Sequence, residues 1–296
     1  MTQKIAIYAP DSKMPNYAIM KVSAYHKEQG DTVEWYTDLW AHTFDKVYCS
    51  KIFNYTPMPN MLNDNCVYGG SGYNLTTKLP ENIENIKPDY TIYPNYIHAL
   101  GFLTRGCIRK CNHCIVPEKE GKIRPYRDIG DVLQGRKTAV LLDNNILACE
   151  YGIKQIEKII KLKIKVDFNQ GLDCRLIDDS IAQILSRVKW LEPIRLACDS
   201  LSMIDPLIKA TRLLRWYNCK PSNYFVYVLV DDIDTAIEIL KVVKGLGLDP
   251  FAQPYRDREG NEPTKEQKDL ARWVNHKAIF KSVLWEDYGK ITKTAS

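Results

Sequence analysis

From residue 99 onward, strand-like and helix-like segments alternate, and this alternation constrains the fold of the 296-residue chain more than any other feature. Six short apolar runs are predicted strands: 100–104, 139–142, 165–168, 194–198, 224–230 and 249–253. Helical runs separate them, for example 152–162, 180–188, 204–216 and 233–246. Strands that alternate with helices predict a parallel α/β sheet or barrel, in which binding residues follow the carboxyl ends of the strands.

Residues 1–95 predict a smaller α/β unit of Rossmann-like type. The expected order is a strand at 4–8, a helix at 16–30, and strands at 32–36 and 46–53. Residues 54–98 are rich in Pro, Asn, Tyr and Gly, and the run Gly69-Gly-Ser-Gly72 is expected to be a flexible connection. Cys49 and Cys66, seventeen residues apart, are expected to be ordinary thiols.

Three cysteines lie within eight positions, in the pattern Cys-x3-Cys-x2-Cys, at Cys107, Cys111 and Cys114. Disulfide bonds do not account for this spacing, because such close neighbours cannot all pair without strain and one is left over. Three converging thiolates suit a metal ion or an iron–sulfur cluster. Zinc usually takes a fourth protein ligand, and no second Cys-x2-Cys pair is present to supply it. The motif favours a [4Fe–4S] cluster with one open iron position, with a small zinc loop as the alternative.

The cysteine pattern, placed after an apolar strand-like run, resembles the signature of radical S-adenosylmethionine (SAM) enzymes. The resemblance implies a [4Fe–4S] cluster on Cys107, Cys111 and Cys114 whose fourth iron chelates SAM. It implies that the reduced cluster cleaves SAM to a 5′-deoxyadenosyl radical, which abstracts hydrogen from a substrate. It also implies a one-electron reductant of flavodoxin or ferredoxin type. The fold expected from the resemblance is a partial (β/α)6 barrel over residues 96–258, followed by a helical extension at 259–296.

The expected unit at residues 1–95 loosely resembles the cobalamin-binding domain that precedes many radical SAM barrels. The motif Asp-x-His-x-x-Gly of that domain, whose histidine ligates cobalt, is absent. His26 and His42 lie in other sequence contexts. No cobalamin is therefore expected.

The radical SAM resemblance also implies which residues contact SAM. His113 takes the place of an aromatic residue that packs on the adenine, and Arg175 is the natural partner of the SAM carboxylate because a guanidinium binds two oxygens at once. The remaining implied contacts follow the predicted strands: Asp143, Asn144, Asn145, Gln170, Asp173 and Asp199. Asp199 has an alternative interpretation as the N-cap of the following helix.

Substrate contacts are expected at the last predicted strand, where Gln253, Tyr255 and Arg256 stand. Asn275, in a following helix, is expected to face the same mouth. Between residues 104 and 137 nine basic side chains oppose four acidic ones. Such a basic region attracts anionic substrates such as RNA or nucleotides, or else neutralises SAM and the cluster.

Composition predicts an ordinary soluble protein, and we expect it in the cytoplasm. Apolar residues make up 45% of the chain and charged residues 26%, and no apolar run is long enough to span a membrane. Nine cysteines without a signal peptide favour a reducing compartment. We therefore expect a radical SAM enzyme that acts on a nucleic acid or nucleotide, as in RNA modification. The alternatives are a peptide-modifying radical SAM enzyme and, from another class, a zinc-dependent nucleic-acid-binding protein without catalysis.

Overall fold

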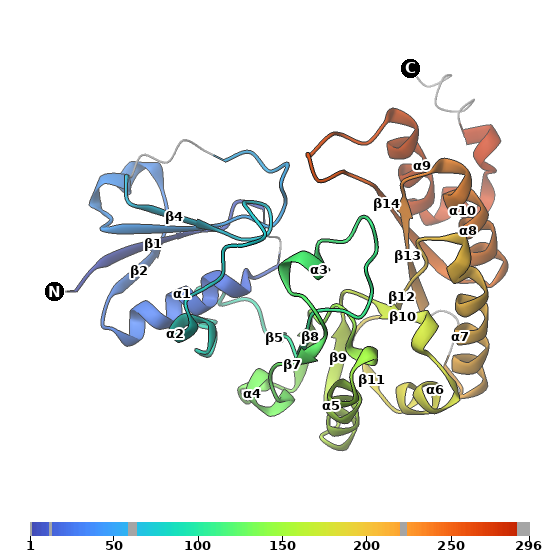
Figure 1. The fold of residues 1–296 in the computed structure, drawn as a ribbon, viewed down its shortest axis with the longest axis horizontal. Helices are drawn as coiled ribbons and strands as arrows, with labels where there is room; N and C mark the ends of the chain where they lie inside the picture. Colours follow the sequence, from blue (N-terminus) through green and yellow to red (C-terminus); the bar gives the residue numbers. More distant parts are fainter. Residues whose placement is uncertain (1, 12–13, 59–63, 220–223, 289–296) are drawn as a thin grey trace.

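The computed structural model describes residues 2–11, 14–58, 64–219 and 224–288. An N-terminal sheet and a larger strand-and-helix region face each other across the molecule (Figure 1). All strand pairs of the three larger sheets are parallel, which confirms the predicted mixed α/β class.

The N-terminal sheet has the strand order β2-β1-β3-β4. Its strands are β1 (Lys4–Tyr8), β2 (Thr32–Trp35), β3 (Lys46–Ser50) and β4 (Cys66–Gly69). Helix α1 (Tyr17–Glu28) begins at Asn16, whose side chain accepts a hydrogen bond from the Ile19 N–H, and α2 (Glu81–Glu84) is a single turn. Strand β4 lies within residues 54–98, where no strand was predicted, because its apolar run is only three residues long.

The Gly-rich run after β4 is closely packed, which corrects its prediction as a flexible connection. A Cβ atom on Gly70 would lie 2.2 Å from the Lys51 carbonyl oxygen, and one on Gly72 would lie 2.4 Å from the Phe53 backbone. Gly70 also has a φ of +91°, in the left-handed region that glycine tolerates best. The glycines therefore let the loop after β4 lie directly on the loop after β3.

The larger region contains two four-stranded sheets that lie side by side. One has the order β5-β8-β9-β11 and the other the order β10-β12-β13-β14. Their bounds are β5 (Ala99–Gly101), β8 (Thr138–Leu141), β9 (Lys165–Phe168), β11 (Lys189–Trp190), β10 (Leu172–Asp173), β12 (Ile194–Ala197), β13 (Tyr224–Val230) and β14 (Asp249–Pro254). Each of the six predicted strands has a counterpart among these elements.

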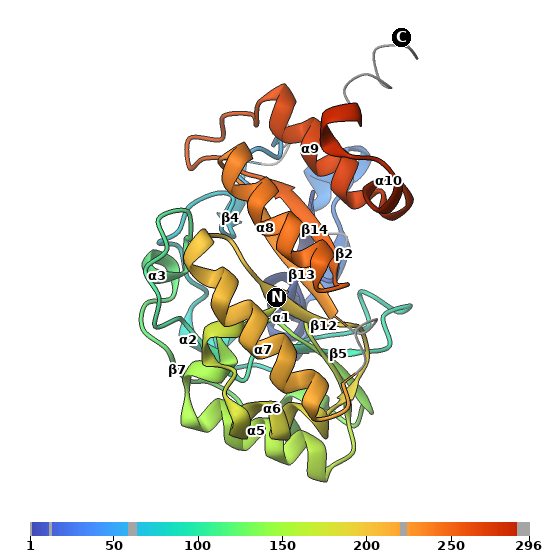
Figure 2. The ribbon, with the colours of Figure 1, turned by 90° about the vertical axis from the view of Figure 1, so that its right-hand side faces the viewer.

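Helices cover the outer side of the two sheets (Figure 2). They are α4 (Ile129–Leu133), α5 (Glu150–Lys161), α6 (Asp179–Ser186), α7 (Ile204–Trp216) and α8 (Ile233–Gly245). Alternate residues of β13, such as Val226, Val228 and Val230, are fully buried beneath them. Alternation along β13 thus directs one face to this core, whereas β5, β8 and β9 are buried along nearly their whole length.

Two further helices, α9 (Lys265–Asn275) and α10 (Lys277–Ser282), pack beside β14 at the C-terminal side. Asn275 does not face the mouth expected for it. Its amide group donates to the Ala252 carbonyl and accepts from the Ala252 N–H, both at 2.9 Å. Asn275 therefore fastens α9 to the edge of β14.

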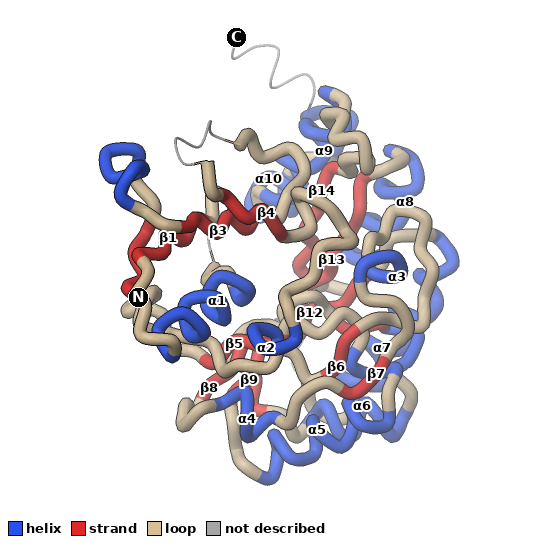
Figure 3. Tube along the Cα trace, turned by 60° about the vertical axis from the view of Figure 1, so that its left-hand side comes forward, coloured by secondary structure: helices blue, strands red, loops and turns tan. Residues whose placement is uncertain are grey.

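The N-terminal unit packs directly on the inner face of the first strands of the larger region. Met20 of α1 is fully buried against Leu100 of β5 and Val140 of β8, together with Tyr90 and Tyr93 of the connecting segment. Figure 3 shows α1 between the N-terminal sheet and strands β5 and β8. Across the described ranges, no helix combines the length and apolarity needed to cross a lipid bilayer.

Candidate functional site

A cavity of about 1820 Å³ lies between the two parts of the molecule. One wall comes from the loops after β1, β3 and β4 of the N-terminal sheet, and we call it the N-terminal wall. The other wall comes from the cysteine loop (residues 106–121) and the residues that follow β8, β9 and β12, and we call it the strand-end wall. Both walls stand at the carboxyl ends of parallel strands, where ligands of α/β proteins bind.

All three cysteines of the motif line the cavity. The Arg109 N–H donates to Cys107 Sγ at 3.3 Å, and the Val116 N–H donates to Cys114 Sγ at 3.5 Å. Burial raises the pKa of the Cys114 thiol, and the Val116 N–H opposes that rise. Backbone N–H donors toward sulfur stabilise thiolate ligands. Within the described residues, no three His, Cys, Asp or Glu side chains gather closely enough to hold a metal ion.

The base of the cysteine loop is closed by two short strands, β6 (Thr104–Arg105) and β7 (Arg124–Pro125), which pair antiparallel. Gly106 has a φ of +85°, and a Cβ atom there would lie 2.3 Å from the Lys122 carbonyl oxygen. Glycine is therefore required directly before Cys107. It lets the two ends of the loop approach each other.

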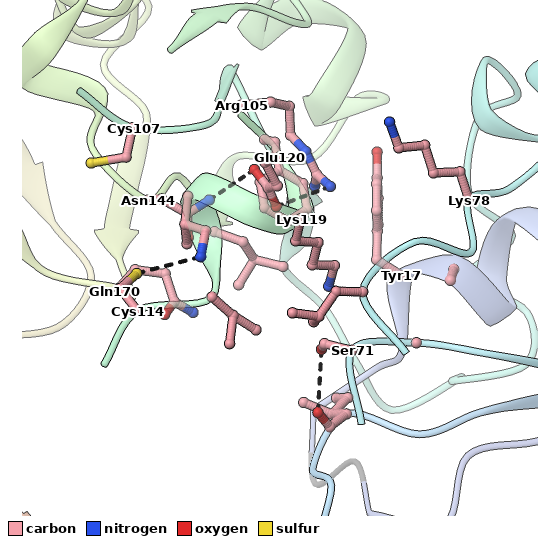
Figure 4. A pocket seen from close by; sticks show the side chains of 18 of the residues that line it. Tyr17, Ser71, Lys78, Arg105, Cys107, Cys114, Lys119, Glu120, Asn144 and Gln170 are labelled. Atoms are coloured by element: carbon pink, nitrogen blue, oxygen red, sulfur yellow. Dashed lines mark hydrogen bonds and ion pairs between the residues drawn. The ribbon is translucent and has the colours of Figure 1, made fainter. Parts of the chain in front are cut away.

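Glu120 organises the same loop, although no sequence pattern predicted this role. Its carboxylate accepts from the Gly106 N–H and from Asn144 Nδ2, both at 2.9 Å, and lies 3.1 Å from Arg105 Nη2 (Figure 4). Asn144, predicted as a SAM contact, lines the cavity and holds this carboxylate. The loop is thereby fixed to the residues after β8.

Asp143 does not face the cavity, which corrects its prediction as a SAM contact. Only 3% of the residue is exposed, and its carboxylate accepts from the N–H groups of Leu103 and Thr104 and from the Thr104 hydroxyl. Burial raises the pKa of Asp143 to about 6, against the opposing effect of these hydrogen bonds. Asp143 therefore fastens the residues after β8 to the segment that leads into the cysteine loop.

Asn145 lies at the back of the cavity, between the cysteine loop and Asp173. Its Nδ2 group is 3.5 Å from Cys107 Sγ and 3.3 Å from Asp173 Oδ2. Only 3% of Asn145 is exposed, and its buried Oδ1 atom has no hydrogen-bond partner among the described residues. A buried acceptor without a donor is costly, so this atom marks a position for a donor from a ligand.

Two arginines converge on Asp173 in the strand-end wall. Arg175 contacts both carboxylate oxygens, at 2.6 and 3.1 Å, and Arg109 Nε donates at 3.0 Å. Burial opposes ionisation, but the hydrogen bonds from Arg175 and Arg109 hold the pKa of Asp173 below its usual range. The predicted carboxylate partner Arg175 is thus already paired with Asp173. The three groups together keep one net positive charge next to the cysteines.

The predicted N-cap role of Asp199 is wrong. Its carboxylate accepts from the Leu229 N–H of β13 at 3.0 Å, and α7 begins five residues later without a side-chain cap. Burial raises the pKa of Asp199. Asp199 lines the cavity together with Gln170, His113 and Gln253.

Tyr255 and Arg256 lie outside the residues that line the cavity, unlike the other predicted substrate contact, Gln253. The Tyr255 ring meets the His113 ring edge-on at 5.9 Å, and Arg256 lies 4.1 Å from the centre of the Tyr55 ring in the N-terminal unit. These two residues therefore border the cysteine loop and the loop after β3.

A polar cluster inside the larger region was also missed. Arg195 of β12 pairs with both oxygens of Asp167 on β9, at 2.8 and 3.1 Å, and its Nη1 lies 3.3 Å from the Tyr227 hydroxyl. The pair bridges the two sheets where their strands lie side by side. Charged residues within otherwise apolar strands are the signal that indicates such a cluster.

Comparison with known proteins finds a similar protein. The chain is 30% identical over 255 residues to the tRNA-2-methylthio-N(6)-dimethylallyladenosine synthase of Sulfurihydrogenibium sp. (strain YO3AOP1). The match covers 74% of this chain and 58% of that protein, so the chain spans little more than half of the relative's length. No protein-family profile matches the chain.

Proposed function

We propose that this protein is a radical SAM enzyme that modifies RNA, with tRNA as its substrate class. The observation that carries the proposal is the meeting of the Cys107, Cys111 and Cys114 loop with the unpartnered Asn145 Oδ1 in one cavity at strand carboxyl ends. The similarity to a tRNA-2-methylthio-N(6)-dimethylallyladenosine synthase supports both the superfamily and the substrate class. Methylthiotransferases form one branch of the radical SAM enzymes.

The chemistry of the donor set fits a [4Fe–4S] cluster, although the three thiols are not gathered closely enough in the described structure to hold a metal ion. Three thiols stand on one loop with backbone N–H donors toward two of the sulfurs, and the loop faces a cavity with room for a further ligand. Cys107, Cys111 and Cys114 would hold three irons, and the fourth would remain open to SAM. Glu120 and Gly106 would keep the loop in the required shape.

The residues around Asn145 fit SAM. Asn145 Oδ1 offers a buried acceptor for an ammonium group, and the net positive charge of Arg109, Asp173 and Arg175 suits a carboxylate nearby. Gln170 and His113 would border the nucleoside. When bound, the cluster and SAM supply a 5′-deoxyadenosyl radical for hydrogen abstraction. This chain's residues hold the ligand, fix its orientation and exclude water from the cavity.

The architecture we propose is a partial (β/α)6 barrel, formed by the two sheets of the larger region over residues 96–258. Residues 1–95 would form a Rossmann-like unit and residues 259–296 a helical extension, of which residues 289–296 lie outside the described part of the chain. A flavodoxin or ferredoxin would supply the electron.

The test is anaerobic reconstitution with iron and sulfide, followed by addition of SAM and dithionite and chromatography for 5′-deoxyadenosine. A brown protein that forms 5′-deoxyadenosine, and that transfers a modification to unmodified tRNA, supports the proposal. A colourless protein that retains stoichiometric zinc after the same treatment contradicts it.

A further inference from the structure

Two aromatic side chains stand exposed and stacked at the mouth of the cavity, in the loop after β3. Phe53 is 42% exposed and Tyr55 is 48% exposed, and their rings lie 5.3 Å apart with an angle of 21° between them. Phe53 lines the N-terminal wall of the cavity. Exposed rings of this size are not explained by packing, because they retain a large apolar area in contact with water.

The loop that presents these rings is held rigidly. The Asp11 carboxylate accepts from the N–H groups of Ile52 and Phe53 and from the Thr56 hydroxyl, at 2.8 to 3.0 Å. From the other side, the buried Lys51 ammonium donates to the carbonyl oxygens of Asn54 and Thr56. A loop fixed in this way presents its rings at little conformational cost on binding.

The same loop is joined to the cysteine-loop side of the molecule. Arg256 lies 4.1 Å from the centre of the Tyr55 ring, and Asn54 Nδ2 donates to the carbonyl oxygens of Asp257 and Arg258. Arg258 in turn pairs with Glu118 at 2.8 Å and donates to the Cys114 carbonyl oxygen. The contact of Asn54 with the Arg258 carbonyl and the contact of Arg258 with the Cys114 carbonyl therefore connect the loop that carries the stacked rings to the proposed cluster site.

Positive charge surrounds the route from these rings into the cavity. Nine basic and six acidic side chains line the cavity. Among the described residues, Lys78, Lys110 and Lys119 form no ion pair within 4.0 Å. Three of the six acidic groups of the lining, Glu84, Glu120 and Asp173, are already paired with basic side chains. Lys78 from the N-terminal wall and Lys119 from the cysteine loop lie on either side of Tyr17 in the same opening (Figure 4). Unpaired cations in a cavity attract a polyanion.

We infer that Phe53 and Tyr55 form a stacking platform for unpaired bases of a single-stranded RNA segment, whose phosphates are met by Lys78, Lys110 and Lys119. The inference rests on the proposed function for its choice of RNA and deepens it to an unpaired loop. Aromatic side chains next to cationic ones bind single strands, because every base has a face that stacks on a ring. A base-paired duplex keeps its bases in the helix and gains nothing from the platform.

The experiment measures fluorescence anisotropy of a labelled RNA hairpin with an unpaired loop, using the reconstituted full chain. Phe53→Leu/Tyr55→Leu removes both rings and keeps apolar side chains. It should bind the hairpin roughly ten- to a hundredfold more weakly than the wild type. Phe53→Tyr keeps a ring and should bind as the wild type does. Trp216→Ala removes another exposed ring, 81% exposed on α7 at the outer side, and should have no effect.

The same RNA annealed to its complement should bind weakly and equally to all four proteins. Lys78→Ala should weaken binding of both RNAs and lower the salt dependence of binding by about one unit of slope. Equal hairpin affinity of the wild type and the double leucine variant, or equal affinity of the wild type for hairpin and duplex, overturns the inference. Formation of 5′-deoxyadenosine is measured in the same preparations. Its absence refutes the proposed function alone, whereas ring-dependent binding still supports the platform.

Discussion

The two walls of the cavity have the same origin and carry different chemistry. Both are built at the carboxyl ends of parallel strands, yet the strand-end wall carries thiols and paired charges such as Asp173 with Arg175. The N-terminal wall carries the glycines at 70 and 72 and the exposed ring of Phe53. Strand geometry therefore creates the cavity, and the loop residues decide what each wall contacts.

The difference extends to how each wall is made rigid. Side-chain carboxylates fix the cysteine loop, with Glu120 and Asp143 accepting several hydrogen bonds each. On the N-terminal wall, backbone contact adds to the hydrogen bonds of the Asp11 carboxylate, because Gly70 and Gly72 let two loops touch without side chains between them. Substitutions in the cysteine loop should therefore affect ligand chemistry, and substitutions at the glycines of the N-terminal wall should affect folding.

The largest effect is expected at the strand-end wall. Cys111→Ala removes one of three proposed cluster ligands, so cluster assembly and SAM cleavage should both be lost. The visible absorption of the reconstituted protein and the yield of 5′-deoxyadenosine measure these outcomes. Cys149→Ala, at the start of α5 and outside the residues that line the cavity, is the matched control and should retain both. Cluster absorption and SAM cleavage that survive in Cys111→Ala contradict the proposed role.

Gly72→Ala tests the N-terminal wall. The new methyl group would lie 2.4 Å from the Phe53 backbone, so the free energy of unfolding should fall by about 3 kcal/mol. Gly245→Ala is the matched control, because a Cβ atom at that helix end meets nothing within 4 Å. It should leave stability unchanged or raise it by up to about 1 kcal/mol. Urea unfolding measures both, and equal stabilities of the two variants would show that the two loops separate readily.

Asn145→Ala tests the proposed SAM site within the strand-end wall. Removing the acceptor Oδ1 should weaken SAM binding by about tenfold or more, as expected for a hydrogen bond to a charged group. Equilibrium dialysis of the reconstituted protein against labelled SAM measures the affinity. Asn261→Ala, which loses only contacts to Asp257, should bind SAM normally. An unchanged affinity in Asn145→Ala would place the SAM ammonium elsewhere.

The sequence predicted the strands of the larger region well, because long alternating runs such as residues 224–230 carry a strong pattern. It missed β4, whose four residues carry none, and it treated the run at Gly69–Gly72 as flexible. In the sequence, a flexible glycine run cannot be distinguished from a glycine run that packs against another backbone segment. Only the neighbouring loop at Lys51–Phe53 distinguishes the two cases.

For the site, strand-end placement brought Asn145, Asp173 and Arg175 to one cavity wall, as the rule for parallel strands predicts. The rule did not predict that Asn145 faces the cavity whereas the side chain of the nearby Asp143 points into the protein, toward Leu103. Glu120 and Lys21 escaped prediction because their partners are distant in sequence. Position relative to a strand is readable from the sequence, whereas side-chain direction depends on the packing around it.

Lys21 joins the two walls through its ammonium group. A substitution there is expected to have the smallest effect of those considered and gives the most specific test of the difference between the walls. It lies in α1 with only 1% of the residue exposed. Its ammonium group is 3.0 Å from Glu84 of α2 and 2.9 Å from the hydroxyl of Tyr126, which follows β7. Burial lowers the pKa of Lys21 to about 8, against the attraction of Glu84.

The free energy of unfolding should therefore rise with pH between about 8 and about 10.5, because the unfolded chain binds more protons than the folded one over that range. The contribution of Lys21 to this slope should reach about 1 kcal/mol per pH unit. Lys21→Met lacks the titrating group and should lose that contribution. Lys265→Met, at a side chain that is 94% exposed, should keep it. Urea unfolding at several pH values compares the three proteins. If the free energy of unfolding of the wild type and of Lys21→Met depends on pH in the same way, Lys21 is solvated in the folded state. Apolar packing alone would then join the two walls.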